Sequence, residues 1–221
     1  MKLCIIIPAY NEALRIEKVV RAAQEYTPDV LVVNDGSADA TEAAARASGA
    51  EVISFKENRG KGHALKCAFE HVLQRDFEAV ITMDGDGQHS PGDLVNIIDG
   101  ACGSDVGVVV GNRMSDPEDM PPARFVTNML MSFILSTICR QNIPDTQCGY
   151  RLIKCSVLRK IKLISSNYEI ESELLIKAAR ARFKIASVPV KSVYTGQTSS
   201  IHPVKDTWRF LAMLCRVTFS R

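Results

Sequence analysis

The stretch Thr82-Met83-Asp84-Gly85-Asp86-Gly87-Gln88-His89 directly follows an apolar, strand-like run, Ala79-Val80-Ile81. Strand side chains repeat every two residues, so Asp84, Asp86 and Gln88 are expected to point the same way where the strand ends. The intervening glycines let the backbone turn and approach a ligand closely. Two carboxylates and an amide oxygen suit Mg²⁺ or Mn²⁺ that completes its shell with water and phosphate oxygens. A polar, Gly-rich β-turn without a metal is the alternative interpretation.

The flanking sequence predicts an α/β fold. Short apolar runs of strand length alternate with segments whose apolar residues recur at helical spacing. This alternation is typical of a mostly parallel central sheet flanked by helices. Strands are expected at 3–7, 30–33, 51–55, 79–83 and 106–110, and helices at 16–23, 39–47, 61–72 and after Ser90.

Polar side chains gather where these predicted strands end. They are Tyr10 and Glu12, then Asp35, then Asp84 and Asp86, and finally Arg113. In parallel α/β sheets, ligands bind at the carboxyl ends of the strands. A divalent cation held there would bridge the two phosphates of a nucleoside diphosphate, and an arginine could clamp them.

In the second half of the chain, strands and helices no longer alternate regularly. The segment 124–140 predicts a helix whose polar residues recur every four positions between apolar ones, so the helix is either buried or lies at a lipid surface. A strand over 185–190 contains Pro189, which favours an edge position. The basic amphipathic helix predicted over 203–219 either packs on the domain or lies on anionic lipid.

Composition excludes several classes of protein. The chain has 221 residues and a net charge of +2, which is too small to indicate nucleic-acid binding. Its seven cysteines include no C-x-x-C pair, as expected for reduced intracellular thiols. The N-terminus predicts no signal peptide, and no apolar run reaches the roughly 18–20 residues of a membrane span. We therefore expect a cytoplasmic protein or one at the cytoplasmic face of a membrane.

Five motifs occur in order and together resemble family 2 glycosyltransferases with the GT-A fold. They are Pro8-Ala9-Tyr10-Asn11-Glu12, Val33-Asn34-Asp35-Gly36-Ser37, Asn58-Arg59-Gly60-Lys61-Gly62, Asp84-Gly85-Asp86-Gly87-Gln88 and Gly111-Asn112-Arg113. The segment Asp145-Thr146-Gln147-Cys148-Gly149-Tyr150-Arg151 and the run 168–175 extend the resemblance over nearly the whole chain. The branch that the chain resembles is that of dolichyl-phosphate mannose synthases and other polyprenyl-phosphate sugar synthases.

The resemblance implies a metal-dependent, inverting hexosyltransferase. It would move a sugar from a GDP- or UDP-linked donor to a polyprenyl or dolichyl phosphate, with Mg²⁺ or Mn²⁺ as cofactor. Residues 1–202 would form one GT-A domain, with a nucleotide-sugar half (1–113) and a helical acceptor half (114–202), followed by the C-terminal helix 203–221. Membrane contact would come from helices 124–140 and 203–219, and no nucleic acid is expected.

Site residues follow from the same resemblance. Asp84, Asp86, Arg113 and Glu171 would be catalytic, and Asp86 and Gln88 the direct metal ligands. Nucleotide-sugar contacts would come from Pro8, Tyr10, Glu12, Val33, Asp35, Lys61, Asp84, Gly85, Asp86 and Arg113. The acceptor would meet Arg124, Asn128, Glu173 and His202.

Other functions remain open at this point. After the last strand, relatives carry an Arg and then G-x-S-K-L, whereas Val193 to Ile201 lacks that Arg and Lys. A non-lipid glycan acceptor is therefore an alternative. A sugar-phosphate nucleotidyltransferase is a further alternative, although that class usually begins with a Gly-rich, Arg-bearing loop. A nucleotide-binding module without catalysis is the third.

Overall fold

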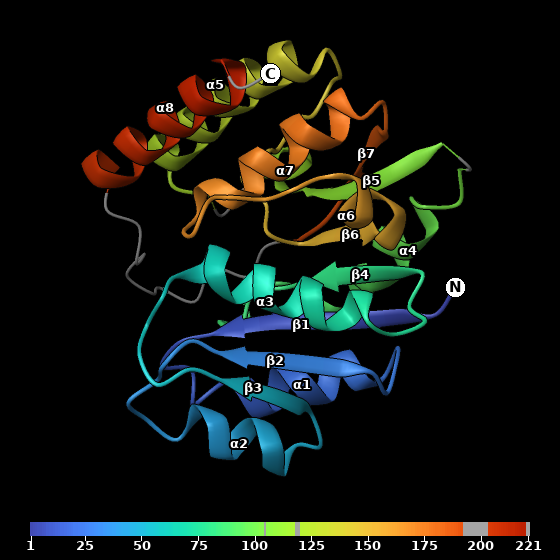
Figure 1. Cartoon of the computed structure of the whole chain (residues 1–221), viewed down its shortest axis with the longest axis vertical. Helices are drawn as coiled ribbons and strands as arrows, with labels where there is room; N and C mark the ends of the chain where they lie inside the picture. Colours follow the sequence, from blue (N-terminus) through green and yellow to red (C-terminus); the bar gives the residue numbers. More distant parts are fainter. Residues whose placement is uncertain (104, 118–119, 192–202, 220–221) are drawn as a thin grey trace.

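A seven-stranded sheet forms the centre of the molecule, with strand order β3-β2-β1-β4-β6-β5-β7 (Figure 1). The computed structural model describes residues 1–103, 105–117, 120–191 and 203–219. The strands are β1 (Leu3–Ala9), β2 (Val30–Asn34), β3 (Glu51–Ser54), β4 (Ala79–Thr82), β5 (Val106–Asn112), β6 (Arg151–Lys154) and β7 (Lys184–Pro189). The predicted α/β class and the edge position of Pro189 are confirmed.

Strand β6 runs against the direction of the others. It is antiparallel to β4 and β5, whereas the remaining pairs are parallel. Thr82, at the end of β4, therefore pairs with Arg151, at the start of β6. This reversal brings the segment before β6 to the edge where the parallel strands end.

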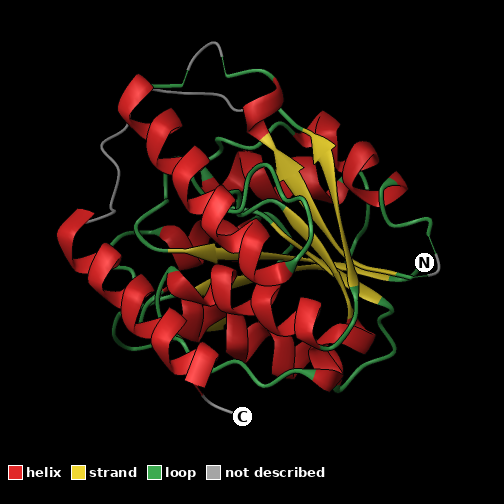
Figure 2. Ribbon diagram, turned by 90° about the horizontal axis from the view of Figure 1, so that it is seen from above, coloured by secondary structure: helices red, strands yellow, loops and turns green. Residues whose placement is uncertain are grey.

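Helices cover both sides of the sheet (Figure 2). They are α1 (Ile16–Gln24), α2 (Thr41–Ala47), α3 (Lys61–Leu73), α4 (Leu94–Asp99), α5 (Pro122–Cys139), α6 (Cys155–Lys160), α7 (Glu169–Arg180) and α8 (Pro203–Phe219), with 3₁₀ turns η1 (Pro91–Asp93) and η2 (Arg113–Ser115). Asn11 lies before α1 with a φ of 57°, and Arg15 is the N-cap residue of that helix.

The core explains the continuous apolar runs of the sequence. Every residue of β2 and of β4 is buried, and in β1 Ile5, Ile6 and Ile7 have no exposed surface. Strands covered on both faces do not alternate apolar with polar residues. Each such side chain contributes about 1.5–3 kcal/mol by leaving water, so the sheet is the rigid support of the site.

Helix α5 is turned the opposite way from an ordinary surface helix. Its polar stripe faces the protein, where Asn128 and Ser132 are buried and Ser136 bonds to Ile143. Its outward side exposes large apolar residues: Val126, Met129, Leu130 and Phe133. Among the described residues, α5 is the one helix long and apolar enough to cross a membrane by length and composition.

Helix α8 packs on the domain. Phe210, Met213 and Val217 are buried in the common core, and Arg180 of α7 donates a hydrogen bond to the carbonyl of Val217. Both α5 and α8 contact α7, and they run side by side in two views (Figures 1 and 2). In the structure the C-terminal helix thus packs on the domain, which is the first of the two predicted arrangements.

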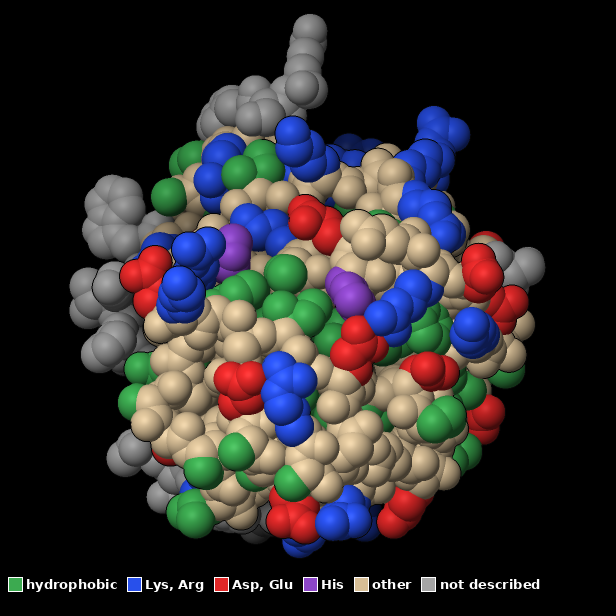
Figure 3. Space-filling model, turned by 60° about the horizontal axis from the view of Figure 1, so that its bottom comes forward, with side chains coloured by type: hydrophobic (Ala, Val, Ile, Leu, Met, Phe, Trp, Pro, Cys, Tyr) green, Lys and Arg blue, Asp and Glu red, His purple; other side chains and the backbone are tan. Residues whose placement is uncertain are grey.

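The surface carries charges of both signs. On the face drawn in Figure 3, acidic and basic side chains lie next to each other and neither sign gathers into one field. This agrees with the small net charge and gives no support to a nucleic-acid partner on that face.

Candidate active site

The first site element is the end of β2 and the start of α3. Both carboxylate oxygens of Asp35 accept backbone hydrogen bonds, from Arg59 and Gly60, each at 2.8 Å. Gly60 has a φ of 92°, and a Cβ there would lie 2.6 Å from the carbonyl of Ser166. Asp35 therefore fixes the loop that delivers Lys61 to the carboxyl edge of the sheet.

Lys61 is the centre of an ion cluster. Its Nζ lies 2.6 Å from Asp84 Oδ1 and 2.7 Å from Glu171 Oε1. The other Asp84 oxygen, Oδ2, lies 3.2 Å from Nε2 of His89. Residues from α3, the loop after β4 and α7 thus meet at one point, and all three are among the predicted site residues.

The cluster changes the acidity of its members. Burial alone would raise the pKa of Asp84, but Lys61 and then His89 lower it far below its usual range. Burial likewise would lower the pKa of Lys61, and the carboxylates of Asp84 and Glu171 raise it well above normal. Both groups therefore stay charged at any physiological pH.

Gly149 makes this convergence sterically possible. A Cβ at that position would lie 2.9 Å from Asp84 Oδ2, 3.0 Å from Lys61 Nζ and 3.1 Å from Glu171 Oε1. Its carbonyl accepts a hydrogen bond of 2.8 Å from Thr82, which ties it to the end of β4. The charged tips rest on the backbone of Gly149 because no side chain is there.

The Asp84–Gln88 loop turns more sharply than a strand pattern predicts. A turn occupies Gly85 and Asp86, and Gly87 has a φ of 74°. The expectation that Asp84, Asp86 and Gln88 share one direction by strand alternation was wrong, because β4 ends at Thr82. Asp86 Oδ1 instead accepts from the backbone N–H of Gln88 at 2.9 Å.

The side chains of this loop suit a hard cation that also binds water or phosphate. Within the described residues, no three His, Cys, Asp or Glu side chains converge as a complete metal site. Asp84, Asp86 and Gln88 nevertheless supply two carboxylates and an amide on one partly exposed loop. Mg²⁺ and Mn²⁺ are bound in this way, with water and phosphate completing the shell.

Glu12 adds a further acid beside this loop. Burial raises the pKa of Glu12, the Arg15 side chain lowers it, and the negative charge of Asp86 raises it again. Its Oε2 accepts from Arg15 at 3.1 Å. The ends of β1 and β4 therefore bring the two predicted acids close together.

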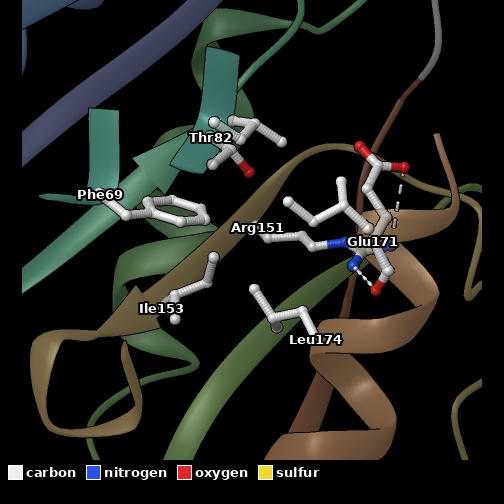
Figure 4. Close-up of a pocket in the computed structure, with 8 residues that line it drawn as sticks. Phe69, Thr82, Arg151, Ile153, Glu171 and Leu174 are labelled. Carbon is white, nitrogen blue, oxygen red and sulfur yellow. Dashed lines mark hydrogen bonds and ion pairs between the residues drawn. The ribbon is translucent and has the colours of Figure 1, made fainter. Parts of the chain in front are cut away.

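Arg151 is a site residue that the sequence prediction did not assign. Its guanidinium is fully buried and donates to the carbonyls of Cys148, Glu171 and Thr146 at 2.7, 2.6 and 2.8 Å. Figure 4 shows its side chain running past Thr82 toward Glu171, beside a small, mainly apolar cavity. Arg151 thereby joins the loop that contains Gly149 to the start of α7. The one sequence feature that could have indicated this role is an arginine at the first position of the short strand that contains Leu152 and Ile153.

Arg113 forms an ion pair with a buried carboxylate. It donates from Nε and Nη2 to the fully buried carboxylate of Asp145, at 2.7 and 3.0 Å. Its charge is thus balanced by a carboxylate within the protein, and its contact with a diphosphate stays a prediction. The pair holds the 145–149 segment against the end of β5.

Two other expectations also need correction. Val33 has no exposed surface, so it belongs to the core rather than to a base-binding wall. Glu173 is fully buried and accepts backbone hydrogen bonds from Ile164 and Ser165 and one from Lys177. Burial would raise the pKa of Glu173, but these hydrogen bonds lower it. It stabilises the loop before α7 instead of facing an acceptor.

The remaining predicted residues lie as follows. Tyr10 is half exposed at the end of β1, and Gly85 packs within 3.3 Å (measured from an added Cβ) of the Pro8 carbonyl. Asn128 is buried, with its Nδ2 3.8 Å from the Met120 sulfur, whereas Arg124 is partly exposed at the start of α5. His202 lies outside the described residues.

A mostly parallel sheet with one reversed strand and this cluster at its carboxyl edge defines a GT-A glycosyltransferase. The chain belongs to glycosyl transferase family 2, whose family model matches residues 4–162.

Named relatives cover most of the chain. A UDP-N-acetylglucosamine–dolichyl-phosphate N-acetylglucosaminyltransferase of Methanococcus voltae is 31% identical over 214 residues, covering 86% of this chain and 85% of the relative. An undecaprenyl-phosphate mannosyltransferase of Micrococcus luteus is 29% identical over 206 residues, covering 87% and 84%.

Solved structures share the fold. Glucosyl-3-phosphoglycerate synthase from Mycobacterium tuberculosis, in complex with Mn²⁺, UDP and glucosyl-3-phosphoglycerate, is similar with a TM-score of 0.76. The match covers 96% of this chain and 78% of that one at 21% identity. This similarity supports the arrangement of sheet and helices described above.

Proposed function

We propose that this glycosyltransferase moves a hexose from a GDP- or UDP-linked sugar to a polyprenyl or dolichyl phosphate. The observation that carries the proposal is the meeting of Lys61, Asp84 and Glu171 at the carboxyl edge of the sheet. A nucleoside diphosphate bound there would meet a cationic group, Lys61, and acids that can bind a metal ion. The relatives named for dolichyl and undecaprenyl phosphate support the acceptor.

On the donor side, Asp84, Asp86 and Gln88 would hold Mg²⁺ or Mn²⁺. Such a cation neutralises the charge that develops on a departing diphosphate. The Mycobacterium tuberculosis neighbour, solved with Mn²⁺ and UDP, supports this choice. Tyr10 and Glu12, at the end of β1, would border the nucleoside.

The transfer needs little acid–base help from the protein. An oxygen of the acceptor phosphate forms a bond to the anomeric carbon while the bond from that carbon to the donor phosphate breaks, which inverts the configuration. A phosphate monoester has a second pKa of about 6 and is already an anion near neutral pH. Glu171, paired with Lys61, would therefore orient groups beside the sugar rather than remove a proton.

The acceptor would arrive along α5. Its outward side exposes Val126, Met129, Leu130 and Phe133, while its polar residues are used inside the protein. Such a face suits the boundary of a bilayer, where a polyprenyl chain resides. Arg124, at the start of the same helix, would meet the acceptor phosphate.

Sugar transfer is tested directly. The purified chain is incubated with labelled UDP- and GDP-sugars and Mn²⁺, with a polyprenyl phosphate, the matching polyprenol or a soluble glycan as acceptor. We expect a lipid-linked product from the phosphate alone, and complete loss in Asp86→Ala but not in Asp99→Asn, an exposed carboxylate on α4. Transfer to the glycan alone, or release of pyrophosphate, would replace the proposal with the corresponding alternative function.

Membrane contact is tested with vesicles of polyprenyl phosphate in anionic phospholipid. Phe133→Glu should reduce co-sedimentation because it places a charge on the exposed apolar face of α5. Leu14→Glu, at the most exposed large apolar residue of the described chain, is the matched control. Both substitutions should change stability by less than about 0.5 kcal/mol. Equal binding by wild type and Phe133→Glu would contradict this orientation.

A further inference from the structure

The ion cluster places Lys61 against Asp84, an acid on the same loop as the predicted metal ligands Asp86 and Gln88. Lys61 donates to Asp84 Oδ1, and His89 lies against Oδ2, so both oxygens of Asp84 already face protein groups. A divalent cation bound to Asp84 Oδ1 would lie next to the positive ammonium group of Lys61, and the two like charges would repel each other. Asp84 therefore binds a cation more readily when Lys61 has moved away.

The contacts that hold Lys61 are strong ones. Its side chain is 15% exposed, and that of Glu171 is 14% exposed, so water screens the pair poorly. The nearby charges are also balanced, because Lys61 and Arg151 face Asp84 and Glu171, with Arg151 Nη2 3.9 Å from Glu171 Oε2. A balanced cluster attracts a free divalent cation only weakly.

Removal of Lys61 would leave the cluster with an excess of negative charge. Asp84 and Glu171 would then be left with Arg151 as the one cation of the described cluster, and Asp86 lies on the same loop. The resulting negative charge favours a divalent cation. A nucleoside diphosphate supplies the anionic oxygens that can draw the ammonium group of Lys61 from the carboxylates.

We propose that Lys61 blocks Asp84 in the nucleotide-free enzyme and thereby couples cation binding to nucleotide binding. The inference rests on the proposed function, since it assumes a nucleoside diphosphate as ligand. Lys61 is in this view a positioning residue as well as a contact of the nucleotide. Coupling free energies between two ligands are typically of the order of fivefold to 150-fold in affinity.

The experiment measures Mn²⁺ affinity from the electron paramagnetic resonance signal of free Mn²⁺. Wild type, Lys61→Met and the control Lys18→Met, which removes an exposed lysine of α1, are each titrated without nucleotide and with saturating UDP or GDP. In wild type, the nucleotide should tighten Mn²⁺ binding about tenfold or more. In Lys61→Met, Mn²⁺ alone should bind about tenfold more tightly than to wild type, and the effect of nucleotide should shrink. Lys18→Met should behave like wild type.

The outcomes separate the two proposals. If neither UDP nor GDP binds with Mn²⁺ to wild type, the proposed function fails. If nucleotide and Mn²⁺ bind but Lys61→Met leaves the affinity for Mn²⁺ alone unchanged or weaker, the blocking role is overturned and the proposed function stands. Lys61→Gln, which keeps a polar side chain, decides the question if Lys61→Met loses its far-ultraviolet circular dichroism.

Discussion

Replacement of Arg151 by methionine should be among the most damaging single changes in this chain. The guanidinium is 1% exposed and donates to three carbonyl groups, those of Cys148, Glu171 and Thr146. Hydrogen bonds to a charged group contribute about 1.5–3 kcal/mol each. Part of that gain offsets the cost of burying the charge, so we expect a net loss of about 3–5 kcal/mol.

Urea unfolding followed by circular dichroism measures this loss. With a slope of about 2 kcal/mol per molar, the midpoint should fall by about 2 M. Arg151→Lys keeps the charge, but one ammonium group cannot reproduce the planar fork of donors, so an intermediate loss of about 2–3 kcal/mol is expected. Arg159→Met, an exposed arginine of α6, should change stability by less than about 0.5 kcal/mol. A loss below about 1 kcal/mol in Arg151→Met would refute the view that this side chain joins the site loop to α7.

Three further changes test other parts of the site. Gly149→Ala should lower kcat/KM about tenfold with little change in the urea midpoint, because the three atoms nearest to its Cβ are charged side-chain tips, at 2.9–3.1 Å; unchanged kinetics would contradict the steric role. Glu173→Gln should cost about 2–3 kcal/mol at neutral pH. Since the folded pKa of Glu173 lies below its ordinary 4.5, the stability that this residue adds is fully present above that pH and is lost as the pH falls. The difference in unfolding free energy between wild type and variant should therefore narrow as the pH falls below 4.5, and a difference that stays constant would contradict this role. A double-mutant cycle of Arg113→Lys and Asp145→Asn should give a coupling energy of about 1–3 kcal/mol, and additive effects would show that the pair is not structural.

Local chemistry made much of the fold predictable. Continuous apolar runs such as Ile5 to Ile7 indicate strands covered on both faces, and the helical spacing between them indicates crossover helices. Once the sheet is mostly parallel, the residues after each strand must meet at one edge. The grouping of Asp35, Asp84 and Lys61 follows from that rule.

Contacts between distant segments lay beyond the reach of sequence patterns. Arg113, which was predicted to contact a diphosphate, pairs with Asp145, which lies 32 positions further along the chain. The family resemblance assigned Glu173 to the acceptor, yet its carboxylate faces the backbone of the preceding loop. In helix α5 the polar residues recur every four positions, and this pattern fits either a buried helix or one at a lipid surface. The contacts with neighbouring segments decide that the polar stripe faces inward.

The amino-acid sequence by itself determined the α/β class, the family and the acidic loop, because these depend on the spacing of residues along a few neighbouring turns and strands. The tertiary structure alone decided the direction of β6, and with it the arrival of Gly149 beside Asp84 and of Arg151 beside Thr82. The direction of a short strand is fixed by pairing with both neighbours at once, and four apolar or basic residues such as 151–154 fit either direction equally well.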